Sequence, residues 1–203
     1  MRSHRLTQTA IVIAISLLAY VAIVGTTTDN PSAVAAEQAD ATFSPYVDSK
    51  GDISLPQGYK QTWAHLGSWA VAKKQGTDIH EMHDVYTPRE TITAYNKTGK
   101  FPDGAVLVKE VRNSISDRMT TGHSAWSTNI KIWFVMIKDQ QERFPDSDHW
   151  GDGWGWALFE AKDPQKNVSV GYDSSCISCH VPAEDTDWIY VNGYPDLQKP
   201  NQE

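Results

Sequence analysis

The pattern of apolar and polar positions along the chain predicts more strand than helix. Alternation is clearest over 129–138, where every second residue is apolar, as expected of a strand with one buried face. One side of this strand would carry Ile130, Ile132, Phe134 and Met136, and the other Lys131 and Trp133. Further strands are predicted over 59–71, 81–86, 105–113 and 154–161, the last entered through a glycine-rich turn at 151–153. The predicted fold class is therefore α+β, mainly antiparallel β.

One helix has clear start and stop signals. Thr87 is the expected N-cap, Pro88 the first helical residue, and Glu90 would complete a capping box. Gly99 is expected to end the helix. The apolar stripe of this helix would consist of Ile92 and Tyr95.

The N-terminus has the three parts of a secretory signal peptide. Arg2 and Arg5 form a basic region, an apolar run of 14 residues follows over 11–24, and Ala33-Val34-Ala35 is an A-x-A cleavage site. The run is shorter than the roughly 18 apolar residues that a spanning helix needs. We expect a signal peptide over 1–35 and a periplasmic protein; an uncleaved N-terminal anchor is the alternative.

The rest of the chain is predicted as one domain behind a short lead-in. Residues 36–58 are polar and are expected to be a loosely ordered lead-in, and 59–203 are expected to form the domain. The formal net charge of −7 argues against nucleic acid and anionic membranes as partners. The charge is compatible with a basic redox partner, although an acidic surface can also simply keep a protein soluble.

The most specific chemistry lies in Cys176-Ile177-Ser178-Cys179-His180, which reads C-x-x-C-H, the attachment pattern of a c-type haem. Two thiols on one turn can each add across a haem vinyl group, and the adjacent imidazole can become the proximal iron ligand. The motif predicts one haem c, covalently held through Cys176 and Cys179, with His180 as the metal ligand. Asp173, Ser174 or Ser175 would cap a short C-terminal attachment helix.

Other interpretations of a C-x-x-C pair fit less well. A structural zinc site needs four ligands, and the chain has no second cysteine pair. A thioredoxin-like redox pair does not require the adjacent histidine. A simple disulfide remains possible in an oxidising compartment.

The late position of the motif bears on the sixth iron ligand. Only 23 residues follow His180, and none of them is methionine. A sixth ligand must therefore come from upstream or be absent, and an open iron suits ligand chemistry better than electron shuttling alone. The upstream candidates are Met82, Met119, Met136, His65, His80, His83, His123 and His149. For Met136, on an apolar strand face, core packing is the expected role.

Several stretches, together with the late C-x-x-C-H motif, resemble the cytochrome P-460 family, which includes the cytochromes c′-beta. The resemblance covers roughly residue 59 to the C-terminus, and its most specific part is the order K-T-G-x-F-x-D-G, then V-K-E, then the haem motif. The matching segments are Val85-Tyr86, Tyr95-Asn96-Lys97-Thr98-Gly99-Lys100-Phe101, Asp103-Gly104, Val108-Lys109-Glu110 and Trp156-Ala157-Leu158-Phe159.

The resemblance implies an antiparallel sheet domain, often dimeric, with haem near its C-terminal end. Its namesakes oxidise hydroxylamine, and in them a lysine on the strand after D-G is covalently joined to the haem ring. Lys109 occupies that place here, and a solvated lysine in a salt bridge is the alternative. Glu110 is expected on the opposite face of the strand, in a structural role.

The resemblance also bears on the distal side of the haem. Hydroxylamine-oxidising members have a carboxylate above the iron, a plausible proton acceptor. That position aligns with Trp133 or Phe134, which are apolar. The cytochromes c′-beta have a bulky aromatic cap that favours small uncharged gases such as nitric oxide, and Phe134 would suit this role or an ordinary core position.

Other polar residues could serve the site. His83 lies where the family has a polar residue beside the haem, and neighbouring acids would raise its pKa. His123 lies in a polar loop that could overhang a pocket. Arg112 and Arg118 could pair with haem propionates, with surface carboxylates as the default. The acidic loop 146–153 lacks the ligand order of a calcium loop and is expected to be a tight turn.

Three functions follow as hypotheses. The first is a periplasmic oxidoreductase that acts on hydroxylamine or nitric oxide and passes electrons to an external cytochrome, with Lys109, His83 and Phe134 as candidate catalytic residues. The second is a gas-binding protein without turnover, capped by Phe134. The third is a low-spin electron-transfer cytochrome. A homodimer is possible in each case.

Overall fold

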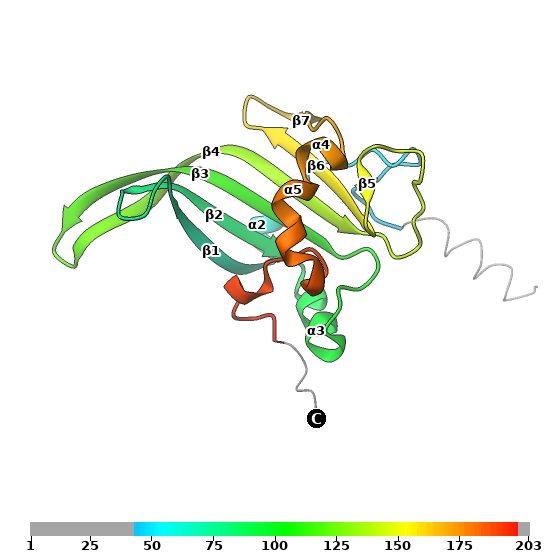
Figure 1. Ribbon diagram of the computed structural model, residues 1–203, viewed down its shortest axis with the longest axis horizontal. Coiled ribbons are helices and arrows are strands. Elements are labelled where there is room, and N and C mark those ends of the chain that lie inside the picture. Colours follow the sequence, from blue (N-terminus) through cyan, green and yellow to red (C-terminus); the bar gives the residue numbers. More distant parts are fainter. Residues whose placement is uncertain (1–42, 199–203) are drawn as a thin grey trace, which may run out of the picture. The chain divides into compact units, whose positions relative to one another are not determined.

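The computed structural model describes residues 43–198, and one antiparallel sheet dominates them (Figure 1). Its order is β1-β2-β3-β4-β6-β5, with β7 paired to β6, and every neighbouring pair is antiparallel. The strands are β1 (Ala64–Ala72), β2 (Ile79–Thr87), β3 (Val106–Met119), β4 (Gly122–Lys138), β5 (Trp150–Gly151), β6 (Trp154–Glu160) and β7 (Asp163–Asn167). The predicted fold class, α+β and mainly antiparallel β, is confirmed.

Short helices accompany the sheet. The α-helices are α2 (Tyr59–Thr62), α3 (Arg89–Thr98), α4 (Tyr172–Ser175) and α5 (Ile177–His180), and 3₁₀ turns follow at η1 (Val181–Thr186) and η2 (Val191–Gly193). The C-terminal attachment helix is thus two short helices that meet at Cys176. Gly171 stands at the N-cap of α4, so the capping role expected of Asp173, Ser174 or Ser175 is wrong.

Helix α3 is confirmed, but the way it begins is not. Its N-cap is Pro88, and the side chain of Thr87 accepts no capping hydrogen bond from the first turn. The Thr87 hydroxyl instead donates to the carbonyl of Val106 at 2.7 Å, because Thr87 is the last residue of β2 and belongs to the sheet. Gly99 ends the helix in the left-handed conformation at φ 71°, as predicted.

The predicted strand over 59–71 is half wrong, because its first four residues form α2. Gly58 precedes them with φ 68°, a backbone conformation that glycine adopts without strain, and this turns the chain into the helix. The preceding segment is also not loose where the structure describes it. Ile53 and Leu55 are buried and pack with Tyr59 beneath the sheet.

The sheet separates two apolar clusters, because alternate residues of each strand point to opposite faces. On one face, Val108, Val135 and Phe159 pack with the 43–58 segment and α2. On the other face, Leu107, Met136 and Trp156 pack with α3 and the C-terminal segment. Helix α5 crosses this second face (Figure 1).

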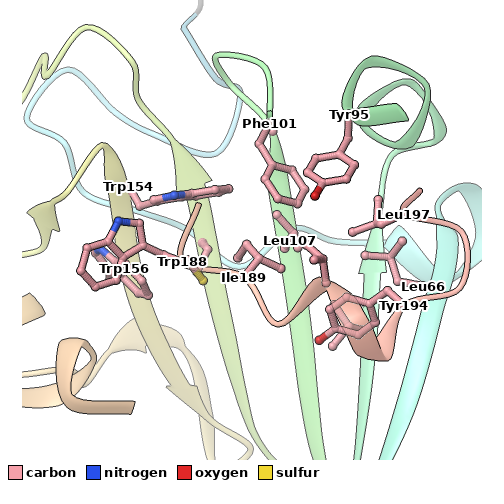
Figure 2. Close-up of a cluster of buried hydrophobic side chains, with 14 of the residues drawn as sticks. Leu66, Tyr95, Phe101, Leu107, Trp154, Trp156, Trp188, Ile189, Tyr194 and Leu197 are labelled. Carbon is pink, nitrogen blue, oxygen red and sulfur yellow. The ribbon is translucent and has the colours of Figure 1, made fainter. Parts of the chain in front are cut away.

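Helix α3 joins the second cluster through Tyr95. The Tyr95 ring lies 4.7 Å from Phe101, which lies 5.5 Å from Trp154 of β6 (Figure 2). These three rings are essentially buried, and they extend the cluster along one end of the sheet.

Strands β3 and β4 continue beyond the rest of the sheet (Figure 1). Strand β2 pairs with β3 as far as Asn113, and β6 pairs with β4 only from Ile132 onward. Beyond these points β3 and β4 pair with each other alone, as a two-stranded ribbon over 114–127. Ile115, Met119 and Trp126 are 50%, 51% and 40% exposed on this ribbon.

The predicted signal peptide over 1–35 lies outside the described residues. Within 43–198, none of the helices has the length and apolar character needed to cross a membrane.

Candidate functional site

A mainly apolar cavity lies between the second face of the sheet and the C-terminal segment. The C-terminal side contributes Cys176, Cys179 and His180, the three residues of the haem motif that bear chemistry. The sheet side contributes residues from four neighbouring strands: Val85, Leu107, Lys109, Phe134, Val135, Met136, Trp156 and Ala157. The cavity therefore brings together residues nearly a hundred positions apart in sequence.

Local structure presents the motif to this cavity. The helical backbone is interrupted at Cys176, between α4 and α5. The Cys179 amide donates to the Cys176 carbonyl at 3.2 Å. Cys176 is buried and Cys179 is exposed. Burial, followed by the neighbouring Cys179, raises the pKa of Cys176 to about 11, although the charge of Lys109 opposes this.

His180 is held in one orientation by its surroundings. Its Nδ1 lies 2.7 Å from the carbonyl oxygen of Trp188, and because a carbonyl can only accept, Nδ1 carries the proton. The lone pair of the neutral ring is therefore on Nε2. Burial, and after it the charge of Lys109, lower the pKa of His180, although the bond to Trp188 acts the other way.

Aromatic rings complete the setting of His180. The Trp156 ring meets the imidazole edge to face at 4.8 Å and 73°, and stacks on Tyr172 of α4 at 5.2 Å. Tyr190 lies 6.1 Å from the imidazole and donates its hydroxyl to the Cys179 carbonyl at 2.6 Å. The ring plane of His180 is thus fixed from several sides.

These residues fit a covalently attached haem. Two thiols and an imidazole open into one apolar cavity, and the proton on Nδ1 leaves Nε2 as the metal-binding atom. Among the described residues, Nε2 has no hydrogen-bond partner. Cys176 and Cys179 would hold the ring, and His180 would hold the iron.

Lys109 lies on the sheet side of the same cavity, and this fits the haem-facing position rather than the solvated one. Its Nζ lies 4.4 Å from the centre of the Phe134 ring, its partner across β3 and β4. Burial lowers the pKa of Lys109, and the nearby cysteines and Glu81 oppose the shift. The side chain therefore presents an amine whose charge is costly to maintain.

Phe134 and Trp133 occupy opposite faces, which separates the two distal candidates. Phe134 lines the cavity, whereas the Trp133 indole donates to the hydroxyl of Tyr59 at 2.9 Å on the far face. Of the two distal candidates, Phe134 is therefore the one that lines the cavity, and no carboxylate of the described chain lines it.

His83 stands beside the cavity rather than in its lining. It shares a sheet face with Val85 and Lys109, one pair further along β2 and β3, and its Nε2 lies 3.4 Å from Glu81. The expectation of a raised pKa is wrong: burial and the charge of Lys109 lower the pKa of His83, and outweigh the pull of Glu81 and Asp84.

Glu110 has the structural surroundings expected of the opposite face. Its carboxylate has no exposed surface and accepts hydrogen bonds from Tyr59 and Arg112, while Lys60 lies 2.6 Å away. Burial alone would raise the pKa of Glu110, but Lys60, Tyr59 and Arg112 together lower it. Arg112 is thus paired with carboxylates, although Glu110 is buried and not at the surface as expected.

Of the upstream methionine and histidine candidates, only Met136 lines the cavity among the described residues, and it also packs in the core. Met119 and His123 lie on the ribbon, where His123 approaches Asp78 at 3.7 Å and Arg118 is paired across the strands with His123. The remaining candidates do not line the cavity, because they contact other side chains or lie on the opposite face of the sheet: Met82, His65, His80 and His149.

The loop over 146–153 is the turn that was expected. It contains the two residues of β5, and Asp152 accepts the hydroxyl of Tyr172. Within 43–198, no cluster of three or more His, Cys, Asp or Glu residues is arranged to hold a metal ion.

Sequence reasoning missed the residues that orient His180. The Trp188 contribution is a backbone carbonyl, which any residue type can supply, so the sequence carries no signal for it. Trp156 was identified only as part of a matching segment. The ion pair between Glu81 and Lys131 was also missed, because it depends on how the strands pair.

Comparison with known families agrees with the geometry. The family model for cytochrome P-460 matches residues 56–191, which include Lys109, Phe134 and the whole C-x-x-C-H motif. No curated protein matches the chain. The match covers most of the chain, and the cavity supplies the thiols and imidazole that a haem c requires, so the protein belongs to the cytochrome P-460 family and is a haem c cytochrome.

Proposed function

We propose that the protein oxidises hydroxylamine, or handles nitric oxide, at an open haem iron, and passes the electrons to an external acceptor. The observation that carries the proposal is that Lys109 lines the same cavity as Cys176, Cys179 and His180. A lysine joined to the ring is what distinguishes the hydroxylamine-oxidising relatives. Its amine must face the ring for such a bond to form.

Bound through both cysteines, the haem would supply an iron that accepts electrons one at a time. The chain's contribution is to hold and shape the site. His180 keeps Nε2 available, the apolar lining limits access by water, and Phe134 restricts the space on the sheet side to small ligands.

Protons must leave hydroxylamine together with its electrons, so a base near the cavity is useful. His83 suits this role, because its lowered pKa keeps it neutral, and therefore able to accept a proton, at physiological pH. A link between Lys109 and the ring would also distort the macrocycle, one of the means by which a protein changes haem behaviour.

The test compares the haem-loaded wild type with Lys109→Met, which keeps length and removes the amine. We expect a red-shifted, broadened Soret band in the ferrous wild type, and hydroxylamine-dependent reduction of an added electron acceptor. Lys109→Met should show an ordinary high-spin c-type spectrum and lose most of the turnover. Lys162→Met is the matched control, because Lys162 pairs with Glu160 and does not line the cavity.

An ordinary wild-type spectrum without turnover would rule out the enzyme. A low-spin spectrum indifferent to added ligands would leave only an electron carrier.

A specific observation favours a second candidate, a gas-binding protein without turnover. No carboxylate lines the cavity within the described chain, and Phe134 lines it, which suits an aromatic cap. An apolar pocket lined by Phe134 suits nitric oxide, which carries no charge. Titration of the ferrous protein with nitric oxide and carbon monoxide tests this, and failure to bind either gas excludes it.

We also propose export to the periplasm, a cytochrome as redox partner, and a homodimer. The N-terminal signal pattern supports export. The acidic net charge of −7 suits a basic cytochrome. The apolar strip of Ile115, Met119 and Trp126 on the ribbon supports self-association, since an identical strip on a second copy would cover it.

A further inference from the structure

The turn that follows η1 has an unusual backbone. Asp187 and Trp188 are consecutive, and both have the positive φ of the left-handed region, 58° and 66°. A residue with a side chain rarely adopts this conformation, and a bulky residue such as tryptophan does so less readily still. Such a turn persists only where the surroundings hold it in place.

One element that holds it is an ion pair with the end of β4. Lys138 Nζ lies 2.6 Å from the Asp187 carboxylate, and the whole Lys138 residue is only 8% exposed. The ammonium also lies 4.9 Å from the centre of the Trp154 ring. A side chain at Gly153 would come within 3.1 Å of Nζ, so the glycine leaves room for the ammonium. The Lys138–Asp187 ion pair is therefore a largely buried, packed contact and not an exposed surface pair.

The turn determines the direction in which the Trp188 carbonyl points. That oxygen accepts from His180 Nδ1 at 2.7 Å and fixes the tautomer and orientation of the imidazole. Backbone bonds from Asp187 to Glu184 and from Trp188 to Ala183 close the turn locally. Among the described residues, Lys138 is the sheet residue whose side chain forms an ion pair with it.

We propose that the Lys138–Asp187 ion pair positions the proximal ligand: it holds the left-handed turn that aims the Trp188 carbonyl at His180. Lys138 and Asp187 are positioning residues, because neither lines the cavity. The inference rests on His180 as the iron ligand, as in the proposed function, and not on the reaction catalysed. The hydrogen bond that Nδ1–H donates to the Trp188 carbonyl makes the imidazole a stronger donor to iron. Loss of this hydrogen bond should therefore weaken the iron–histidine bond.

The test measures the iron–histidine stretching vibration of the ferrous haem-loaded protein by resonance Raman spectroscopy, together with the midpoint reduction potential. Lys138→Met and Asp187→Ala should both lower the stretching frequency and make the potential more positive, because a weaker donor stabilises ferric iron less. Lys138→Arg keeps the charge and should restore values close to wild type.

Lys162→Met is the control. It breaks an ion pair of the same 2.6 Å length with Glu160, but Lys162 is largely exposed and both residues lie at the β6–β7 turn. We expect no change in either readout for this variant.

If Lys138→Met does not mature, Asp187→Asn removes the charge alone and should shift both readouts in the same direction. Folded Lys138 or Asp187 variants with the frequency and potential of wild type would overturn the proposal. An equal shift in Lys162→Met would do the same. Hydroxylamine turnover of the same samples reports on the proposed reaction separately, so the two ideas can fail independently.

Discussion

Lys109 and Glu110 are neighbours in sequence, yet they serve opposite faces of the sheet. The alternation of a strand sends Lys109 into the haem cavity and Glu110 into a buried cluster with Tyr59, Lys60 and Arg112. A buried carboxylate is tolerated only when cations and donors satisfy it. Glu110 therefore stabilises the strand from which Lys109 projects.

Replacing Glu110 with Gln should destabilise the haem-loaded protein by about 3 kcal/mol at neutral pH, because two cations lose their buried partner. The native pKa of Glu110 lies below its unfolded value, so its contribution is complete above the usual carboxyl pKa of about 4.3. The contribution is lost as the pH falls through the lowered native pKa. Urea unfolding across this pH range should show the two proteins converging in acid.

The matched control for this variant is Glu160→Gln, which breaks an exposed pair with Lys162. Exposed pairs contribute little to stability, so little change is expected at any pH. Equal effects of the two substitutions would show that Glu110 is an ordinary surface carboxylate.

At the scale of elements, a close contact between β5 and α4 fixes where the attachment segment lies. A Cβ added to Gly151 would overlap the ring of Tyr172, the first residue of α4. Tyr172 in turn stacks on Trp156, which contacts His180. The absent side chain at Gly151 is thus linked through two rings to His180, the proposed iron ligand.

Gly151→Ala should cost about 1–3 kcal/mol, because the Tyr172 ring must move to admit the methyl group. Denaturant unfolding of the haem-loaded protein measures this. Tyr172→Ala removes the obstructing ring, so Gly151→Ala should cost much less in that background, and a double-mutant cycle gives the coupling. Additive effects would mean that the two residues do not conflict.

The elements also show what the sequence could reveal. The alternation in β4 and the stop at Gly99 are local signals, and both were predicted correctly. The start of α3 was not, because the Thr87 hydroxyl is engaged by Val106, on a strand that the sequence alone does not place beside it. The motif placed Cys176, Cys179 and His180 in one site, whereas the contact of Lys109 with Phe134 required the register of β3 and β4.

At the scale of the whole molecule, the ribbon of β3 and β4 is the feature that most needs a partner. A two-stranded hairpin is marginal by itself in water; among the described residues no other strand pairs with this one, and it exposes Ile115, Met119 and Trp126 on one face. Ile115 and Trp126 are directly paired across the two strands. A second copy of the chain, bringing the same strip, would bury both.

Ile115→Lys or Trp126→Lys should convert the predicted dimer to a monomer, since a charge would enter the centre of the apolar contact. Size-exclusion chromatography with light scattering reports the mass directly. Arg118→Ala is the control, because Arg118 lies on the other face of the ribbon and should leave the dimer intact. A wild type that stays monomeric at high concentration would contradict the prediction.

The division of the cavity between sheet and C-terminal segment has a consequence for biosynthesis. Every sheet residue that lines the cavity precedes Cys176 in the chain, and both attachment cysteines follow the last strand. A polypeptide that emerges N-terminus first can complete the sheet before its thiols appear. Haem attachment then becomes a late step, in which the C-terminal segment carries the haem to a sheet that has already formed.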